Sequence, residues 1–172
     1  MKFRLAGESA ATLALGAALI AGAAAVAQGP SEAPPDRSQD MAWVSAQQAA
    51  LAERAAQPGW RMLDDGVLYR RTAGDGTGAR PKIQDVVTVH YTGTFVDGSV
   101  FDSSEGGNPA TFPLDRLIPA WKIAIPQMGV GDTIEIATPA TAAYGMKGKG
   151  PIPGGATLLF TVRLLDIGET VN

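Results

Sequence analysis

The sequence predicts an α+β domain in which five or six short antiparallel strands form a sheet with one short helix. From residue 66 onward, short alternating segments are separated by Gly and Asp turns, which is the pattern of antiparallel strands. Within this region only residues 117–125 are typical of a helix. A helix on one face of an antiparallel sheet defines the α+β class. The chain has 172 residues, 45% of them apolar, which suits one globular domain with appendages.

Residues 1–27 have the composition of a secretory signal peptide. Lys2 and Arg4 precede an apolar or small-residue run at 11–27, and an A-x-A cleavage site ends at Ala27. We expect cleavage after Ala27 and a periplasmic or secreted protein. The alternative is an uncleaved segment that anchors the chain in a membrane, the one case in which a membrane would be a partner.

Two segments lie between this segment and the domain. Residues 28–39 are polar and proline-rich, which predicts a disordered linker. Residues 40–58 are rich in Ala, Gln and Leu and end at Pro58-Gly59, which predicts a short helix with Met41, Val44 and Leu51 near one face. This helix could dock loosely or space the domain from a membrane, and a dimerisation arm is the alternative.

The strands and the helix of the domain, which we place at residues 66–170, follow in order. Asp97-Gly98 marks a turn between two strands, and Pro119 suits the first turn of the helix. A loop rich in Gly and Pro runs from 139 to 155. The predicted strands are residues 66–71, 85–95, 100–103, 110–114, 133–138 and 157–166.

Composition excludes several classes of function. The formal charge is -3 and the chain has no Lys/Arg run, so we expect no nucleic-acid partner. Cysteine is absent, which excludes disulfides, thiolate metal sites and cysteine nucleophiles. With one histidine, His90, a histidine-based metal cluster is also excluded, and we expect neither a metal nor a cofactor.

Two apparent catalytic motifs fail on their context. The Gly-Lys run at 145–150 has no Ser or Thr after a Gly-Lys pair, and Pro151 replaces the helix that a phosphate loop requires. Ser103-Ser104 is not in a G-x-S-x-G elbow. Strand alternation also places His90 on the face opposite Tyr91, so a structural histidine is expected rather than a catalytic base.

A set of aromatic and branched residues at strand ends and in loops could line a binding pocket, although for any one of them core packing is the better explanation. Tyr144 lies in a Gly/Pro-rich loop with little local core to enter, and Asp102 follows Phe101 without a basic residue nearby in sequence. Both features favour a ligand-facing site. The set comprises Tyr91, Phe101, Phe112, Ile118, Trp121, Tyr144, Ile152 and Phe160.

Several short motifs in one order resemble the FKBP-type peptidyl-prolyl isomerases over residues 66–168. The resemblance implies a bent sheet wrapped over the helix, with a proline-binding cavity between them, and it suggests the exported bacterial branch of that family. The motifs are Val89-His90-Tyr91-Thr92-Gly93, Asp97-Gly98, Val100-Phe101-Asp102-Ser103-Ser104, Leu117-Ile118-Pro119-Ala120-Trp121, Gln127-Met128, Val130-Gly131, Ala143-Tyr144-Gly145, Ile152-Pro153 and Ala156-Thr157-Leu158-Leu159-Phe160.

By position, the resemblance implies that Trp121 forms the cavity floor, that Tyr144 lies at the rim and that Asp102 lies beside Tyr91. We expect Asp102 to accept a hydrogen bond from the Tyr91 hydroxyl. The implied catalytic residues are Tyr91, Asp102 and Tyr144. The implied substrate-binding residues are Phe101, Phe112, Leu117, Ile118, Trp121, Ile152 and Phe160.

The implied function is isomerisation of X-Pro bonds in proline-containing peptides and in unfolded or folding exported proteins. The alternative is a binding module or holdase chaperone that uses the same cavity without catalysis. Macrolide-type ligands bind many members of the family. Here Ala110 stands near a position where many members carry an aromatic residue, and the loop at 146–151 is about one residue shorter, so we expect weaker macrolide binding.

Overall fold

The computed structural model describes Arg37 and residues 39–168. The predicted signal peptide at 1–27 and nearly all of the predicted linker at 28–39 lie outside the described residues. Within the described part of the chain, no helix is both long enough and apolar enough to cross a membrane.

A sheet of seven strands forms the domain, all of its pairs antiparallel. The order is β1-β2-β6-β7-β3-β4, and β5 pairs with β3. All six predicted strands are present, and the added strand, β1, has two residues and so no periodic pattern to detect. The strands are β1 (Arg61–Met62), β2 (Leu68–Ala73), β3 (Val86–Thr94), β4 (Val100–Ser103), β5 (Ala110–Pro113), β6 (Thr133–Thr138) and β7 (Leu158–Gly168).

Strand β3 organises the pocket side of the sheet. One of its edges pairs with β7 along its whole length, while the other pairs with β5 at residues 86–89 and with β4 at residues 92–94. Register shifts occur after Thr88 against β7 and after Gly93 against β4, and such bulges bend a strand. Val87, Val89 and Tyr91 are buried on one face of β3, as the alternation predicts.

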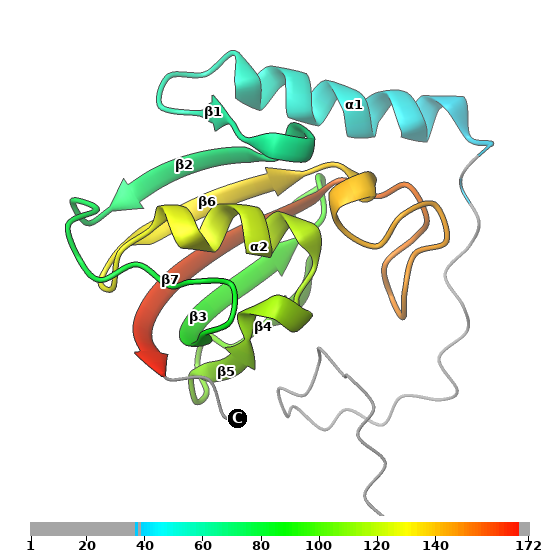
Figure 1. Ribbon diagram of the computed structural model, residues 1–172. Coiled ribbons are helices and arrows are strands. Elements are labelled where there is room, and N and C mark those ends of the chain that lie inside the picture. Colours follow the sequence, from blue (N-terminus) through cyan, green and yellow to red (C-terminus); the bar gives the residue numbers. More distant parts are fainter. Residues whose placement is uncertain (1–36, 38, 169–172) are drawn as a thin grey trace, which may run out of the picture.

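The helix α2 (Pro119–Ala124) lies across the inner face of this sheet (Figure 1). Pro119 occupies its first turn, and Ala120, Trp121 and Ala124 are buried against the sheet in one hydrophobic core. Four 3-10 turns accompany the regular elements and were not predicted, because each is only three residues long. They are η1 (Asp64–Gly66), η2 (Leu114–Arg116), η3 (Ile125–Gln127) and η4 (Ala140–Ala142).

The N-terminal helix α1 (Met41–Ala55) lies at the β1–β2 end of the domain (Figure 1). Asp40 caps it by accepting a hydrogen bond from the Trp43 N–H at 3.0 Å. The predicted apolar face is wrong in one respect, because Met41 is 72% exposed. The buried residues of α1 are instead Gln47 and Ala50, since Gln47 finds hydrogen-bond partners within the domain.

Candidate active site

Five aromatic rings from five elements meet between α2 and the sheet. The Trp121 ring on α2 lies 5.3 Å from Tyr91 on β3 and 5.5 Å from Phe160 on β7, measured between ring centroids. Phe101 on β4 lies 5.7 Å from Phe160. Each of these pairs is edge-to-face, a favourable arrangement for aromatic quadrupoles. The fifth ring, Phe112 on β5, packs edge-on against both Tyr91 and Trp121.

These rings enclose a small hollow. Trp121 is 2% exposed and therefore lies deep within it, whereas Phe101, Ile118 and Tyr144 are only partly buried and form its rim. The enclosed volume is about 10 Å³, close to the minimum that holds one water. The residues that line the hollow are Tyr91, Phe101, Asp102, Leu117, Ile118, Trp121, Tyr144 and Phe160.

The Tyr91 hydroxyl donates a hydrogen bond of 2.5 Å to Asp102 Oδ2, as the sequence analysis predicts. Ser104 ties the end of β4 to β3, because Ser104 N donates to the Tyr91 carbonyl and Tyr91 N donates to Ser104 Oγ, both at 2.9 Å. No salt bridge to Asp102 is formed by the residues that the structure describes. Its charge is therefore available to the hollow.

Burial and the Asp102 carboxylate keep two phenols protonated. Burial, followed by the hydrogen bond to Asp102, raises the pKa of Tyr91 far above its ordinary value of 10. Burial and the charge of Asp102 also raise the pKa of Tyr144. Both hydroxyls are consequently neutral donors at physiological pH.

Backbone and indole donors add to this set. Ile118 is the N-cap residue of α2, and its N–H has no hydrogen-bond partner among the described residues. The indole N–H of Trp121 is buried and, within the same part of the chain, also lacks a partner. Unpaired donors beside an apolar hollow are suited to a ligand that carries a carbonyl oxygen.

The structure places most of the predicted site residues together, with two exceptions. Phe112 forms a second layer behind Tyr91 and Trp121 and does not line the hollow. Ile152 is 2% exposed and belongs to the core cluster, so it supports the site without facing it. His90 points its Nδ1 to Ser104 Oγ at 3.2 Å, which fits a structural histidine.

Gly93 is a site residue that the sequence analysis did not single out. A Cβ at this position would lie 2.5 Å from Cζ of Phe101 and 3.1 Å from Cε1 of Phe160, so only glycine lets both rings close over the strand. A glycine inside an otherwise alternating strand is the signal that could have identified it.

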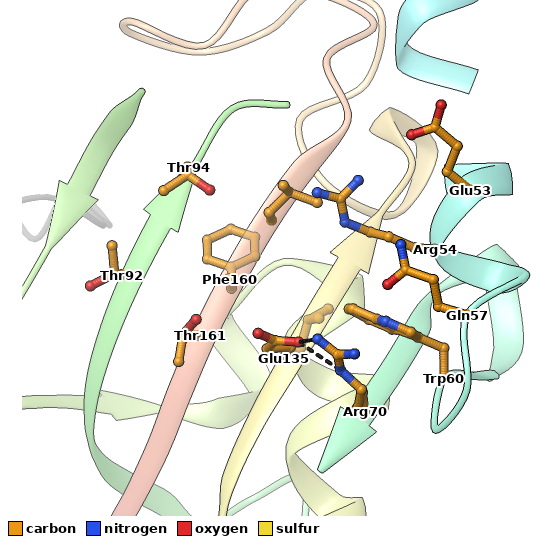
Figure 2. Close-up of a pocket in the computed structure, with 12 residues that line it drawn as sticks. Glu53, Arg54, Gln57, Trp60, Arg70, Thr92, Thr94, Glu135, Phe160 and Thr161 are labelled. Carbon is orange, nitrogen blue, oxygen red and sulfur yellow. Dashed lines mark hydrogen bonds and ion pairs between the residues drawn. The ribbon is translucent and has the colours of Figure 1, made fainter. Parts of the chain in front are cut away.

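A second cleft, on the outer face of the sheet, is larger but has different chemistry (Figure 2). It encloses about 330 Å³ beside the C-terminal end of α1. Arg70 Nη2 lies there 2.5 Å from Glu135 Oε2, and Arg70 Cζ lies 4.8 Å from the centroid of the Trp60 ring. Phe160 on β7 borders both cavities. Charged and hydroxyl side chains dominate the outer cleft, so the smaller aromatic hollow is the better site for an apolar ring.

Fold and site together define an α+β domain with a small aromatic hollow between its helix and its bent sheet. Residues 78–165 match the sequence profile described as "FKBP-type peptidyl-prolyl cis-trans isomerase". This match spans half of the sequence, and the chain belongs to the FKBP-type peptidyl-prolyl cis-trans isomerase family.

Bacterial relatives agree with this assignment. The chain is 46% identical over 118 residues to the FKBP-type peptidyl-prolyl cis-trans isomerase FkpA of Aeromonas hydrophila. This alignment covers 68% of this chain and 44% of that protein. It is 43% identical over 121 residues to the outer membrane protein MIP of Legionella longbeachae. This alignment covers 69% of this chain and 52% of that protein. The chain thus spans about half the length of these curated relatives.

Solved structures show the same fold. The crystal structure of the peptidyl-prolyl cis-trans isomerase from Pseudomonas syringae pv. tomato DC3000 superimposes with a TM-score of 0.69 at 32% identity, over 74% of this chain and 95% of that one. The crystal structure of FkpA from Escherichia coli superimposes with a TM-score of 0.73 at 34% identity, over 77% of this chain and 63% of that one.

Proposed function

We propose that this protein is a peptidyl-prolyl cis-trans isomerase that accelerates rotation about X-Pro bonds in exported, folding proteins. The observation that carries the proposal is the Trp121-centred ring cluster, with the Tyr91–Asp102 hydrogen bond at its edge. Membership of the isomerase family supports it.

The chemistry requires no nucleophile or proton shuttle. Amide resonance gives the C–N bond double-bond character and a rotation barrier of about 18–20 kcal/mol. Water stabilises the planar, charge-separated amide, so a dry aromatic hollow lowers the barrier when it removes water from the prolyl carbonyl. Each ~1.4 kcal/mol removed from the barrier is a tenfold gain in rate.

Directional contacts hold the substrate while it rotates. The prolyl ring enters over Trp121 by displacing the partly exposed rim side chains, because the hollow is too small to hold it otherwise. The Ile118 N–H and the Tyr144 hydroxyl donate to substrate carbonyls. Asp102, held by Tyr91, supplies negative charge beside the twisting amide.

A protease-coupled isomerisation assay on Leu-Pro and Glu-Pro peptides tests the proposal. Trp121→Ala and Tyr144→Phe should each lower kcat/KM, by about tenfold or more for Trp121→Ala, since its ring forms the floor. The chain offers matched controls in Trp60→Ala, which alters the outer cleft, and Tyr69→Phe, which alters a buried tyrosine away from the hollow. Circular dichroism establishes that each variant is folded.

No acceleration at micromolar protein would overturn the proposal in favour of a binding module or holdase chaperone. Macrolide-type ligands are expected to bind the same hollow, but less tightly than they bind family members with an aromatic residue near the position of Ala110. A titration followed by tryptophan fluorescence measures that affinity.

We further propose a periplasmic or secreted location, which rests on the composition of residues 1–27. One relative is named an outer membrane protein, which agrees with export. N-terminal sequencing of the protein recovered from the cell envelope would show whether the chain begins after Ala27.

A further inference from the structure

The most buried polar side chain of the N-terminal helix contacts the loop that completes the candidate site. Gln47 is 5% exposed on α1, although the residues on either side of it are exposed. Its Oε1 accepts a hydrogen bond from the Thr157 N–H at 2.9 Å, and its main-chain carbonyl accepts one from the Thr157 hydroxyl at 3.1 Å. Two buried hydrogen bonds therefore join positions that are 110 residues apart.

Thr157 ends the long loop between η4 and β7, and this loop carries Tyr144. The loop is tied internally at the same place, because Gly155 N donates to the Gly145 carbonyl at 3.0 Å. Lys149 and Ile152 exchange two further main-chain hydrogen bonds, of 2.9 and 3.0 Å. Gly155, two residues before Thr157, is thus tied to Gly145, the residue next to Tyr144.

A second contact from α1 reaches the same loop. A Cβ at Gly155 would lie 3.3 Å from Cζ3 of Trp43 and 3.4 Å from Cε of Met146, so the Trp43 ring packs over this turn. The N-terminal half of α1 lies over the loop, as Figure 1 shows. The helix therefore holds the loop at two points, one polar and one aromatic.

We propose that Gln47 is a positioning residue for the isomerase site: by binding Thr157 it holds the loop in the arrangement that keeps Tyr144 at the rim of the hollow. The inference rests on the proposed function, because it assigns Gln47 an effect on substrate binding. A buried Thr157 N–H has no other acceptor in the described residues, so loss of the Gln47 amide frees the loop to leave this arrangement.

The variant Gln47→Met removes the acceptor while keeping the length and bulk of the side chain. Substrate binds only when the loop is in its ordered arrangement, so the apparent KM should rise as the fraction of molecules with an ordered loop falls. We expect a rise of about 3- to 10-fold, with kcat changed less than about twofold. Gln47→Glu keeps an oxygen acceptor, so its KM should stay close to the wild-type value. Gln48→Met, on the exposed neighbour, is the matched control and should behave as wild type.

Amide hydrogen exchange provides a readout that does not depend on activity. In Gln47→Met, exchange should quicken at Thr157 and Gly155 and remain unchanged at Val162, which is buried in β7. Ala50→Gly alters the other buried residue of α1 and controls for a general loosening of the helix.

The outcomes separate this inference from the proposed function. A wild-type KM in Gln47→Met would overturn it, as would the same KM change in Ala50→Gly. If the wild-type chain catalyses no isomerisation, the proposed function fails, and the exchange data then decide the inference: unchanged exchange at Thr157 and Gly155 overturns it, and selective quickening supports it.

Discussion

Among the residues that the structure describes, Asp102 is the only acidic side chain that lines the hollow, and its contact with Tyr91 is the shortest polar contact there. A carboxylate that accepts from a buried phenol is fixed in place, and its charge acts strongly on nearby groups because the surrounding rings exclude water. This single contact combines the positioning and the electrostatic parts of the proposed mechanism.

Two substitutions separate those parts. Asp102→Leu removes both the acceptor and the charge and should lower kcat/KM by about tenfold, whereas Asp102→Asn keeps an acceptor and should lose less. Asp166→Asn, an exposed carboxylate on β7, serves as the control. Unchanged turnover of an X-Pro peptide by a folded Asp102→Leu protein would exclude the assigned role.

The raised pKa values of Tyr91 and Tyr144 predict how stability depends on pH. A phenol with a raised pKa in the folded protein favours folding while the pH is below its unfolded value of 10, and this contribution is lost as the pH rises through the folded value. The free energy of unfolding should therefore stay flat between about pH 7 and 9 and fall above about pH 10.

Urea titrations across this range measure the effect. Tyr91→Phe should reduce the fall above pH 10. An identical slope for wild type and Tyr91→Phe would show that the buried phenol does not drive the loss of stability.

Among the elements, the start of β6 is held by one buried carboxylate. Asp132 is 2% exposed and accepts hydrogen bonds from Gly129 N at 2.8 Å, Gly76 N at 3.0 Å and Arg71 Nε at 3.1 Å. It joins the turn after η3, the loop after β2 and β2 itself. No periodic pattern marks such a residue, because Gly76 and Arg71 are 56 and 61 residues away in sequence.

Asp132→Ala should lower the free energy of unfolding by about 3 kcal/mol, since it leaves buried donors and a partly buried guanidinium without their acceptor. Denaturant melts measure the loss, with Asp166→Ala as the exposed control. Because Asp132 does not line the hollow, kcat/KM of the folded variant should change less than about twofold. A loss of stability no larger than that of Asp166→Ala would contradict this account.

For the whole molecule, α1 behaves as an attachment to a domain that has its own core. Gln47 and Ala50 are its only buried residues among those that the structure describes, whereas every buried residue of the core cluster lies between Val67 and Leu164, outside α1. We therefore propose that the chain from residue 58 onward folds as one cooperative unit, with the isomerase domain at 66–170, of which the last two residues lie outside the described structure.

A chain lacking residues 1–57 should unfold in a single transition at a lower urea concentration than a chain that begins at Arg37. The expected loss is about 1–3 kcal/mol, the contribution of the two hydrogen bonds to Thr157 together with the contacts of Trp43. Failure of the shorter chain to fold would show that α1 is part of the domain core.

Local patterns in the sequence determined six of the seven strands and the two α-helices of the described residues. Alternation at residues 85–95, the turn at Asp97-Gly98 and Pro119 in the first turn of α2 depend on neighbours in the chain, so they could be predicted. The Tyr91–Asp102 hydrogen bond could be predicted from the family resemblance, which implies that these two residues lie side by side.

Only the tertiary structure decided which side chains close the hollow and which lie behind it. Phe112 and Ile152 are aromatic or branched apolar residues like those that line the hollow. Packing nevertheless places Phe112 in a second layer and Ile152 in the core. The burial of Gln47 likewise depends on Thr157, 110 residues away. The physical reason is that periodicity reports which face of an element is apolar, whereas side-chain packing and long-range hydrogen bonds are set when distant elements meet.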